Sequence, residues 1–185
     1  MNKQLNSSYS ARGQFFLAYR DSEHEHSGQA YYKHLARTAG AETPLILKWK
    51  FEMFAVSEMR RLAVADACLS EVLLVSTREG EPLCPHVKTF LAECRMRTPI
   101  GLKLVVVLLS GDPEFCDVRC PDHAFLEHAA EFFGAALVIH STDLPNETHF
   151  TRLAAMLEPD RRIEEPRSDI IHVPSAIEQM SGVGV

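Results

Sequence analysis

The sequence predicts an α/β fold built around one mostly parallel, five-stranded sheet with helices on both faces. Three observations support this prediction. Apolar runs and amphipathic helical stretches alternate five times along the chain, and strict alternation requires crossover connections between parallel strands. Two of the runs are apolar at consecutive positions, as in strands buried on both faces. The alternating pattern spans only about 150 residues, too few for an eight-stranded barrel.

The first two strand–helix units occupy the N-terminal part of the pattern. The apolar run over residues 14–19 predicts a strand, and apolar residues at helical intervals over 27–40 predict a helix that ends at Gly40. Apolar residues at every second position over 45–53 predict a half-exposed strand near an edge. A helix over 57–71 follows, with Ser57 as its expected N-cap.

The remaining three units repeat the pattern. They predict strands over 72–77, 102–110 and 136–141 and helices over 85–97, 122–134 and 147–159. Asp122 is the expected cap of one helix and Gly134 its stop.

The chain divides into one domain and two ends. Residues 1–12 are polar and without periodicity, so we expect a disordered arm there, followed by the domain over 13–159. Residues 160–185 predict a C-terminal extension, in which "DIIHV" is compatible with a short extra strand or an extended arm.

Composition restricts the location and the partners. The formal net charge of −6 argues against a nucleic-acid or anionic membrane surface. No apolar run approaches the roughly 20 residues that cross a bilayer, and the N-terminus lacks the apolar segment of a signal peptide. The five cysteines have no repeating spacing, so we expect a cytoplasmic protein with free thiols and no structural disulfide.

A doubly wound sheet of five units fits the strand order 2-1-3-4-5, in which ligands bind at the carboxyl ends of the strands. Polar residues follow four of the expected strands, and we therefore expect a crevice lined by Asp21, Ser76, Thr77, Ser110, Asp112 and His140. The run of units over 14–159 resembles the response-regulator receiver domain and, more distantly, flavodoxin.

The receiver resemblance implies a phosphoacceptor carboxylate after the third strand and a lysine after the fifth. Here Ser76 and Thr77 stand in place of the carboxylate, and His140 in place of the lysine. Aspartyl-phosphate chemistry is therefore not expected, and the resemblance implies a receiver-like module without its usual reaction.

The flavodoxin resemblance implies a first loop whose backbone N–H groups surround a phosphate. The corresponding segment, "RDSEHEHSGQ" over 20–29, carries Asp21, Glu23 and Glu25, which would repel a phosphate. No glycine-rich dinucleotide or P-loop motif occurs in the sequence, so we expect no cofactor.

Two clusters of histidine and cysteine are candidate metal sites, but each also has a simpler structural explanation. His24 and His26 could offer imidazoles to a metal, but a solvated polar loop also explains them. Cys116, Cys120 and His123 have a spacing that matches no zinc family, so we expect no metal site.

Two further residues have similar alternatives. Cys84, near the start of a predicted helix, is a candidate nucleophile, although a semi-buried thiol is the commoner case. Trp49 lies between two lysines, and its alternating neighbours favour core packing over a recognition surface.

The function expected from the sequence is a non-catalytic, receiver-like signalling module that acts through a protein partner or through self-association as a homo-oligomer. The alternative is a small hydrolase or ligand-binding enzyme that uses the crevice of Asp21, Thr77, Ser110 and His140.

Overall fold

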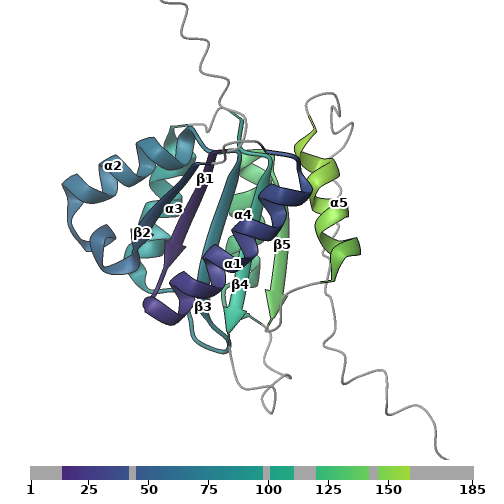
Figure 1. Cartoon of the computed structure of the whole chain (residues 1–185). Helices are drawn as coiled ribbons and strands as arrows, with labels where there is room; N and C mark the ends of the chain where they lie inside the picture. The colour runs from purple at the N-terminus through teal and green to yellow at the C-terminus, as the bar shows by residue number, and fades with distance from the viewer. Residues whose placement is uncertain (1–13, 42–44, 98–100, 111–119, 142–145, 159–185) are drawn as a thin grey trace, which may run out of the picture.

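The computed structural model describes residues 14–41, 45–97, 101–110, 120–141 and 146–158, which form a single α/β sheet domain (Figure 1). Its strands are β1 (Gln14–Tyr19), β2 (Leu45–Lys50), β3 (Val72–Arg78), β4 (Leu104–Ser110) and β5 (Ala136–Ser141). Its helices are α1 (Ser22–Thr38), α2 (Ser57–Cys68), α3 (Pro85–Met96), α4 (His123–Phe133) and α5 (Glu147–Leu157), with the 3-10 helix η1 (Phe51–Ala55) after β2. All the described neighbouring strands are parallel and their order is β2-β1-β3-β4-β5, which confirms the predicted fold class.

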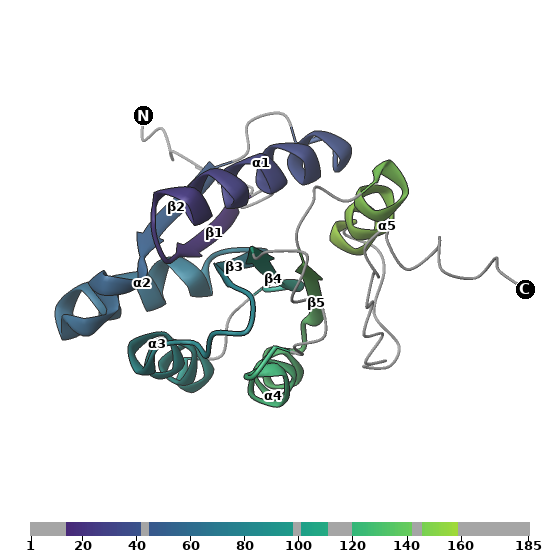
Figure 2. The same ribbon diagram turned by 90° about the horizontal axis from the view of Figure 1, so that it is seen from below.

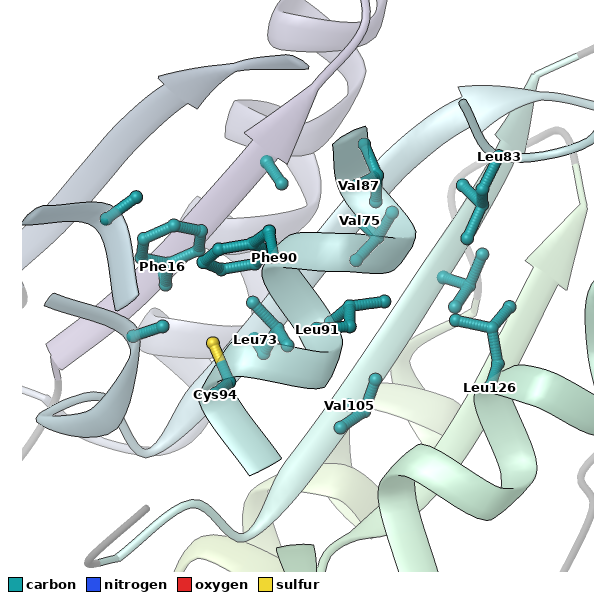
Figure 3. Close-up of a cluster of buried hydrophobic side chains, with 14 of the residues drawn as sticks. Phe16, Leu73, Val75, Leu83, Val87, Phe90, Leu91, Cys94, Val105 and Leu126 are labelled. Carbon is teal, nitrogen blue, oxygen red and sulfur yellow. The ribbon is translucent and has the colours of Figure 1, made fainter. Parts of the chain in front are cut away.

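The helices form one layer on each face of the sheet (Figure 2). Helices α1 and α5 cover one face, over a core that includes Phe15 and Leu74, and α2, α3 and α4 cover the other. On the second face Phe16 of β1 stacks on Phe90 of α3, with ring centroids 5.3 Å apart (Figure 3). Because β3 and β4 lie between the two layers, both are buried on both faces, as their consecutive apolar residues predicted.

The second strand is shorter than predicted. The alternation suggested a strand that reaches Met53, whereas β2 ends at Lys50 and the chain enters η1. Phe51 and Phe54 are both buried, and side chains three residues apart share a side in a 3-10 helix but not in a strand. Trp49 packs against the same core and its indole nitrogen donates to Asp66 Oδ2 at 3.1 Å.

The first helix begins earlier than predicted. Residues 20–26 were expected to be a solvated loop, but α1 begins at Ser22 and its first turns are helical. The side chain of Asp21 caps this end, and acidic residues in a first helical turn interact favourably with the helix dipole. The apolar residues at helical intervals begin only after this capped turn. A prediction from their periodicity therefore places the start of α1 too late.

The two predicted ends, 1–12 and 160–185, lie outside the described residues. Within the described ranges, no helix is both long enough and apolar enough to cross a membrane.

Candidate functional site

The carboxyl ends of the strands bring several predicted site residues onto one row of the sheet. Ser76 lies beside Leu108 in the register of β3 and β4, and Leu108 lies beside His140 in that of β4 and β5. Two strand spacings therefore separate Ser76 from His140, about 10 Å. Both belong to the face covered by α1 and α5, whereas Thr77 belongs to the opposite face because side chains alternate along a strand.

Burial distinguishes these residues from the lining of an open crevice. Ser76, Thr77 and His140 are all buried in the described structure, and Ser110 is half-buried. Asp112 lies outside the described residues. The sequence thus predicted the edge at which these residues gather, but three of them belong to the interior beneath the helices.

Asp21 holds the first turn of α1 together. Its Oδ1 accepts hydrogen bonds from the backbone N–H groups of Glu23, at 3.0 Å, and His24, at 3.2 Å. The same oxygen lies 2.7 Å from His24 Nδ1. The hydrogen bond with the His24 side chain is the main cause that lowers the pKa of Asp21, so this carboxylate is held in its charged form.

His24 is buried against the sheet, contrary to the solvated loop expected for it. While Nδ1 contacts Asp21, its Nε2 is buried and has no hydrogen-bond partner among the described residues. The hydroxyl of Ser76 is likewise buried and without such a partner in that part of the chain. His26 lies on the exposed side, where its Nδ1 is 2.5 Å from the carbonyl oxygen of Ser22.

Ion pairs connect the loops after β1 and β3. Arg20, directly after β1, binds Glu81 in the loop before α3, and Arg78 binds the other oxygen of Glu81 at 3.3 Å. The backbone N–H of Arg20 also donates to the carbonyl oxygen of Ser76 at 3.3 Å. The two loops thus meet at this edge, and both guanidinium groups already have a carboxylate partner.

Asp122 connects α4 to the same loop in an unexpected way. The sequence predicted that its side chain caps α4, but the structure shows no such capping hydrogen bond. Instead Oδ2 accepts from the backbone N–H of Leu83 at 2.5 Å, and Oδ1 lies 2.6 Å from Lys88 Nζ. Ser57 likewise caps no helix, because it is already the first residue of α2.

A second buried polar cluster lies between α1, α5 and the end of β5. The hydroxyl of Tyr31 and Nε2 of His149 are 2.9 Å apart, and the His149 ring centroid lies 5.6 Å from that of His140. Burial, followed by the charges of His140 and Arg152, lowers the pKa of His149 to about 4. Burial also raises the pKa of Tyr31, so Tyr31 and His149 are both neutral near pH 7.

The structure brings together two thiols that the sequence analysis did not pair. Cys68 ends α2 and Cys94 lies on α3, and Cys68 packs against the core cluster to which Cys94 belongs. Cys94 is 2% exposed and points into the core (Figure 3), whereas Cys68 is half-buried at its edge. The interaction with the Cys94 side chain lowers the pKa of Cys68 to about 7. The same interaction, followed by burial, raises the pKa of Cys94.

The other cysteines are dispersed in the described structure. Cys84 is the N-cap residue of α3, without a capping side-chain bond, and Cys120 is half-buried, with its pKa raised by burial. Cys116 lies outside the described residues, so the arrangement considered with Cys120 and His123 is not described. Among the described residues, no three His, Cys, Asp or Glu side chains are grouped closely enough to hold a metal ion.

Comparison with known proteins shows the fold. No family model and no curated protein matches the chain. An oxidoreductase from Corynebacterium diphtheriae is similar in structure, with a TM-score of 0.53, 10% identity, and coverage of 79% of this chain and 95% of that one. A two-electron reduced flavodoxin of Megasphaera elsdenii has a TM-score of 0.47, 15% identity, and coverage of 77% and 97%. An apo NADH:FMN oxidoreductase has a TM-score of 0.48, 12% identity, and coverage of 85% and 99%.

These comparisons correct the predicted function. The expected non-catalytic, receiver-like signalling module is wrong, and so is its alternative, a small hydrolase or ligand-binding enzyme that uses the crevice, because the similar solved structure with a TM-score of 0.53 is an oxidoreductase. The strand order β2-β1-β3-β4-β5 is that of the flavodoxin-like fold, as the sequence indicated. Self-association and a protein partner stay predictions.

The first turn of α1 does not suit the phosphate of a flavin mononucleotide. A phosphate at a helix N-terminus binds the free backbone N–H groups there. Here the N–H groups of Glu23 and His24 already bind the carboxylate of Asp21, and Glu23 and Glu25 add negative charge. The flavodoxin-like fold is thus present without a first loop suited to that group.

Proposed function

We propose that the protein acts in oxidation–reduction and that its reacting groups are the thiols of Cys68 and Cys94. The observation that carries this proposal is that Cys68, half-buried at the end of α2, packs against the same core cluster that contains the buried Cys94 of α3. Such a pair is able to form a disulfide that joins the two helices. The proposal rests on these residues, since similarity at 10% identity concerns the fold alone.

The environment of the pair gives each thiol a different role. Thiolates, not thiols, attack disulfides. The hydrogen bond from Cys94 and the nearby charge of Arg97 favour the thiolate of Cys68, which is also the more exposed of the two. Cys68 is therefore the attacking group, and the buried Cys94 keeps its proton until the second step.

A small disulfide is the oxidant in the reaction that we propose. The Cys68 thiolate attacks one of its sulfur atoms, which forms a mixed disulfide and releases the first thiolate. Cys94 then loses its proton, attacks the sulfur of Cys68 and releases the second thiol. The protein pair is oxidised by two electrons, and the small disulfide is reduced to two thiols.

We also propose a cytoplasmic location. A pair that is oxidised by a small disulfide needs a reductant to regenerate its thiols, and the cytoplasm supplies one through glutathione and thioredoxin. The four cysteines within the described ranges, Cys68, Cys84, Cys94 and Cys120, are free thiols.

The test is a redox titration of the native protein in mixtures of reduced and oxidised dithiothreitol. After trapping with an alkylating agent, peptide mapping should find one disulfide, between Cys68 and Cys94, with a midpoint of roughly −300 to −200 mV. Cys68→Ser and Cys94→Ser should each abolish this species. Cys84→Ser and Cys120→Ser are matched controls that should leave it unchanged.

Two results would contradict the proposal. One is that both thiols stay fully alkylatable throughout the titration while the far-ultraviolet circular dichroism remains native. The other is that the disulfide forms only after the protein unfolds, because the contact would then serve packing alone.

A further inference from the structure

We propose that the carboxylate of Asp21 takes the place of a phosphate at the start of α1, so that this chain does not hold flavin mononucleotide by its phosphate there. This inference concerns the opposite face of the sheet from Cys68 and Cys94 and is independent of the proposed function. It starts from the disagreement between a flavodoxin-like fold and the residues of its first helical turn.

Three donors converge on a single oxygen of Asp21. They are the backbone N–H of Glu23 at 3.0 Å, the backbone N–H of His24 at 3.2 Å and the Nδ1 of His24 at 2.7 Å. Converging N–H groups at a helix N-terminus are the elements of an anion site. In this chain the anion is a side chain, covalently attached and held at the helix end by its extended backbone.

Exchange of this carboxylate for a phosphate would be unfavourable. An entering phosphate has to displace Asp21, whose negative charge would then remain next to it. Glu23 and Glu25 contribute further negative charge in the same turn. The cations close by already have partners, because Arg20 binds Glu81 and Lys48 binds Glu25 at 2.7 Å.

The buried side of the turn keeps His24 in place. Residue His24 is 1% exposed, and Gly28, one helical turn later, lies against Leu17 of β1 so closely that a Cβ would come within 2.5 Å of Leu17 Cδ1. The imidazole thus lies on the buried side of α1, where its Nδ1 reaches the first turn.

The experiment measures binding of inorganic phosphate, flavin mononucleotide and riboflavin to the full chain by calorimetry and flavin fluorescence. Riboflavin lacks the phosphate of flavin mononucleotide and is therefore the reference ligand. The wild type should bind flavin mononucleotide no more tightly than riboflavin, and it should bind inorganic phosphate no more tightly either. Asp21→Ser should bind inorganic phosphate roughly tenfold or more tightly than the wild type, because it removes one negative charge and leaves the three donors with only a neutral hydroxyl, which a phosphate is able to displace. Serine is itself a good N-cap, so the helix should remain folded.

Glu23→Gln is the matched control, since it removes the same charge from the same turn but leaves Asp21 in place. It should bind phosphate as the wild type does. Asp21→Gly, also tolerated at an N-cap, should reproduce the gain if Asp21→Ser proves unfolded by circular dichroism. Tighter binding of flavin mononucleotide than of riboflavin by the wild type would overturn the inference, and so would equal gains in Asp21→Ser and Glu23→Gln.

Discussion

His149 shows how a single residue makes the stability of this fold depend on pH. It lies on α5, buried, with Nε2 at 2.9 Å from the hydroxyl of Tyr31. Burial is the first cause that lowers its pKa to about 4, and the charges of His140 and Arg152 contribute in the same direction. The neutral imidazole is therefore the form that the folded protein accommodates.

The free energy of unfolding should decrease as the pH falls from about 6.5 to about 4. Between these pH values the unfolded chain binds a proton at His149 that the folded chain does not bind. Above about pH 6.5 the imidazole is neutral in both states, so His149 does not change the free energy of unfolding there. Glutamine at position 149 keeps a hydrogen-bonding group for Tyr31 and does not titrate. Urea unfolding followed across this pH range should thus show a shallower dependence for His149→Gln.

His128 provides the control for this experiment. It lies on α4 with its side chain 67% exposed, and its nearest acidic partner, Glu131, is 3.9 Å away. His128→Gln should keep the pH dependence of the wild type. A profile for His149→Gln as steep as that of the wild type would contradict the role assigned to His149.

At the scale of elements, the close contact between α1 and β1 depends on Gly28. The glycine is buried in α1, and a Cβ at this position would lie 2.5 Å from Cδ1 and 3.0 Å from Cδ2 of Leu17. Leu17 is fully buried and has little room to move. Helix propensity therefore favours alanine at this position, whereas packing against Leu17 favours glycine.

Gly28→Ala should destabilise the protein by about 1–2 kcal/mol. Alanine gains up to about 1 kcal/mol in helix propensity, but overpacking of a dense core costs typically 1–3 kcal/mol. Chemical denaturation measures the difference. Ser27→Ala, on a less buried position of the same helix, should show little loss and serves as the control for propensity.

A double variant, Leu17→Ala with Gly28→Ala, tests whether the cost arises from the clash between the new Cβ and the Leu17 side chain. Leu17→Ala removes the atoms that the new methyl group would meet, so Gly28→Ala should cost less in that background. An equal cost in both backgrounds would mean that packing against Leu17 is not the reason for the glycine.

The elements also show what the sequence alone was able to predict. Strands β3 and β4 were predicted because burial on both faces leaves an unmistakable run of apolar residues in the sequence. The start of α1 was missed because its first turn is polar and depends on the capping geometry of Asp21. Cys68 and Cys94 were not paired because their contact depends on α2 and α3 packing on the same face, which no local pattern encodes.

The molecule as a whole has two helical layers that share one sheet. The thiol pair lies in the layer of α2, α3 and α4, while the cluster of Tyr31 and His149 lies in the layer of α1 and α5 (Figure 2). The central strands β1, β3 and β4 contribute side chains to both layers. Opening of these strands would therefore disrupt both cores together, whereas β2 lies at the edge of the sheet that the described strands form.

Native-state hydrogen exchange should reveal this arrangement as a gradient across the sheet. Amides of β3 and β4, which each have six consecutive buried residues, should exchange only through global unfolding. Every residue of β2 is exposed or half-exposed, so its amides should exchange through smaller openings, roughly a hundredfold faster or more. Exchange followed by mass spectrometry with increasing urea measures both, because global openings respond strongly to denaturant and local ones weakly. Equal rates and equal urea dependence in β2 and β3 would instead mean that the whole sheet opens as a single unit.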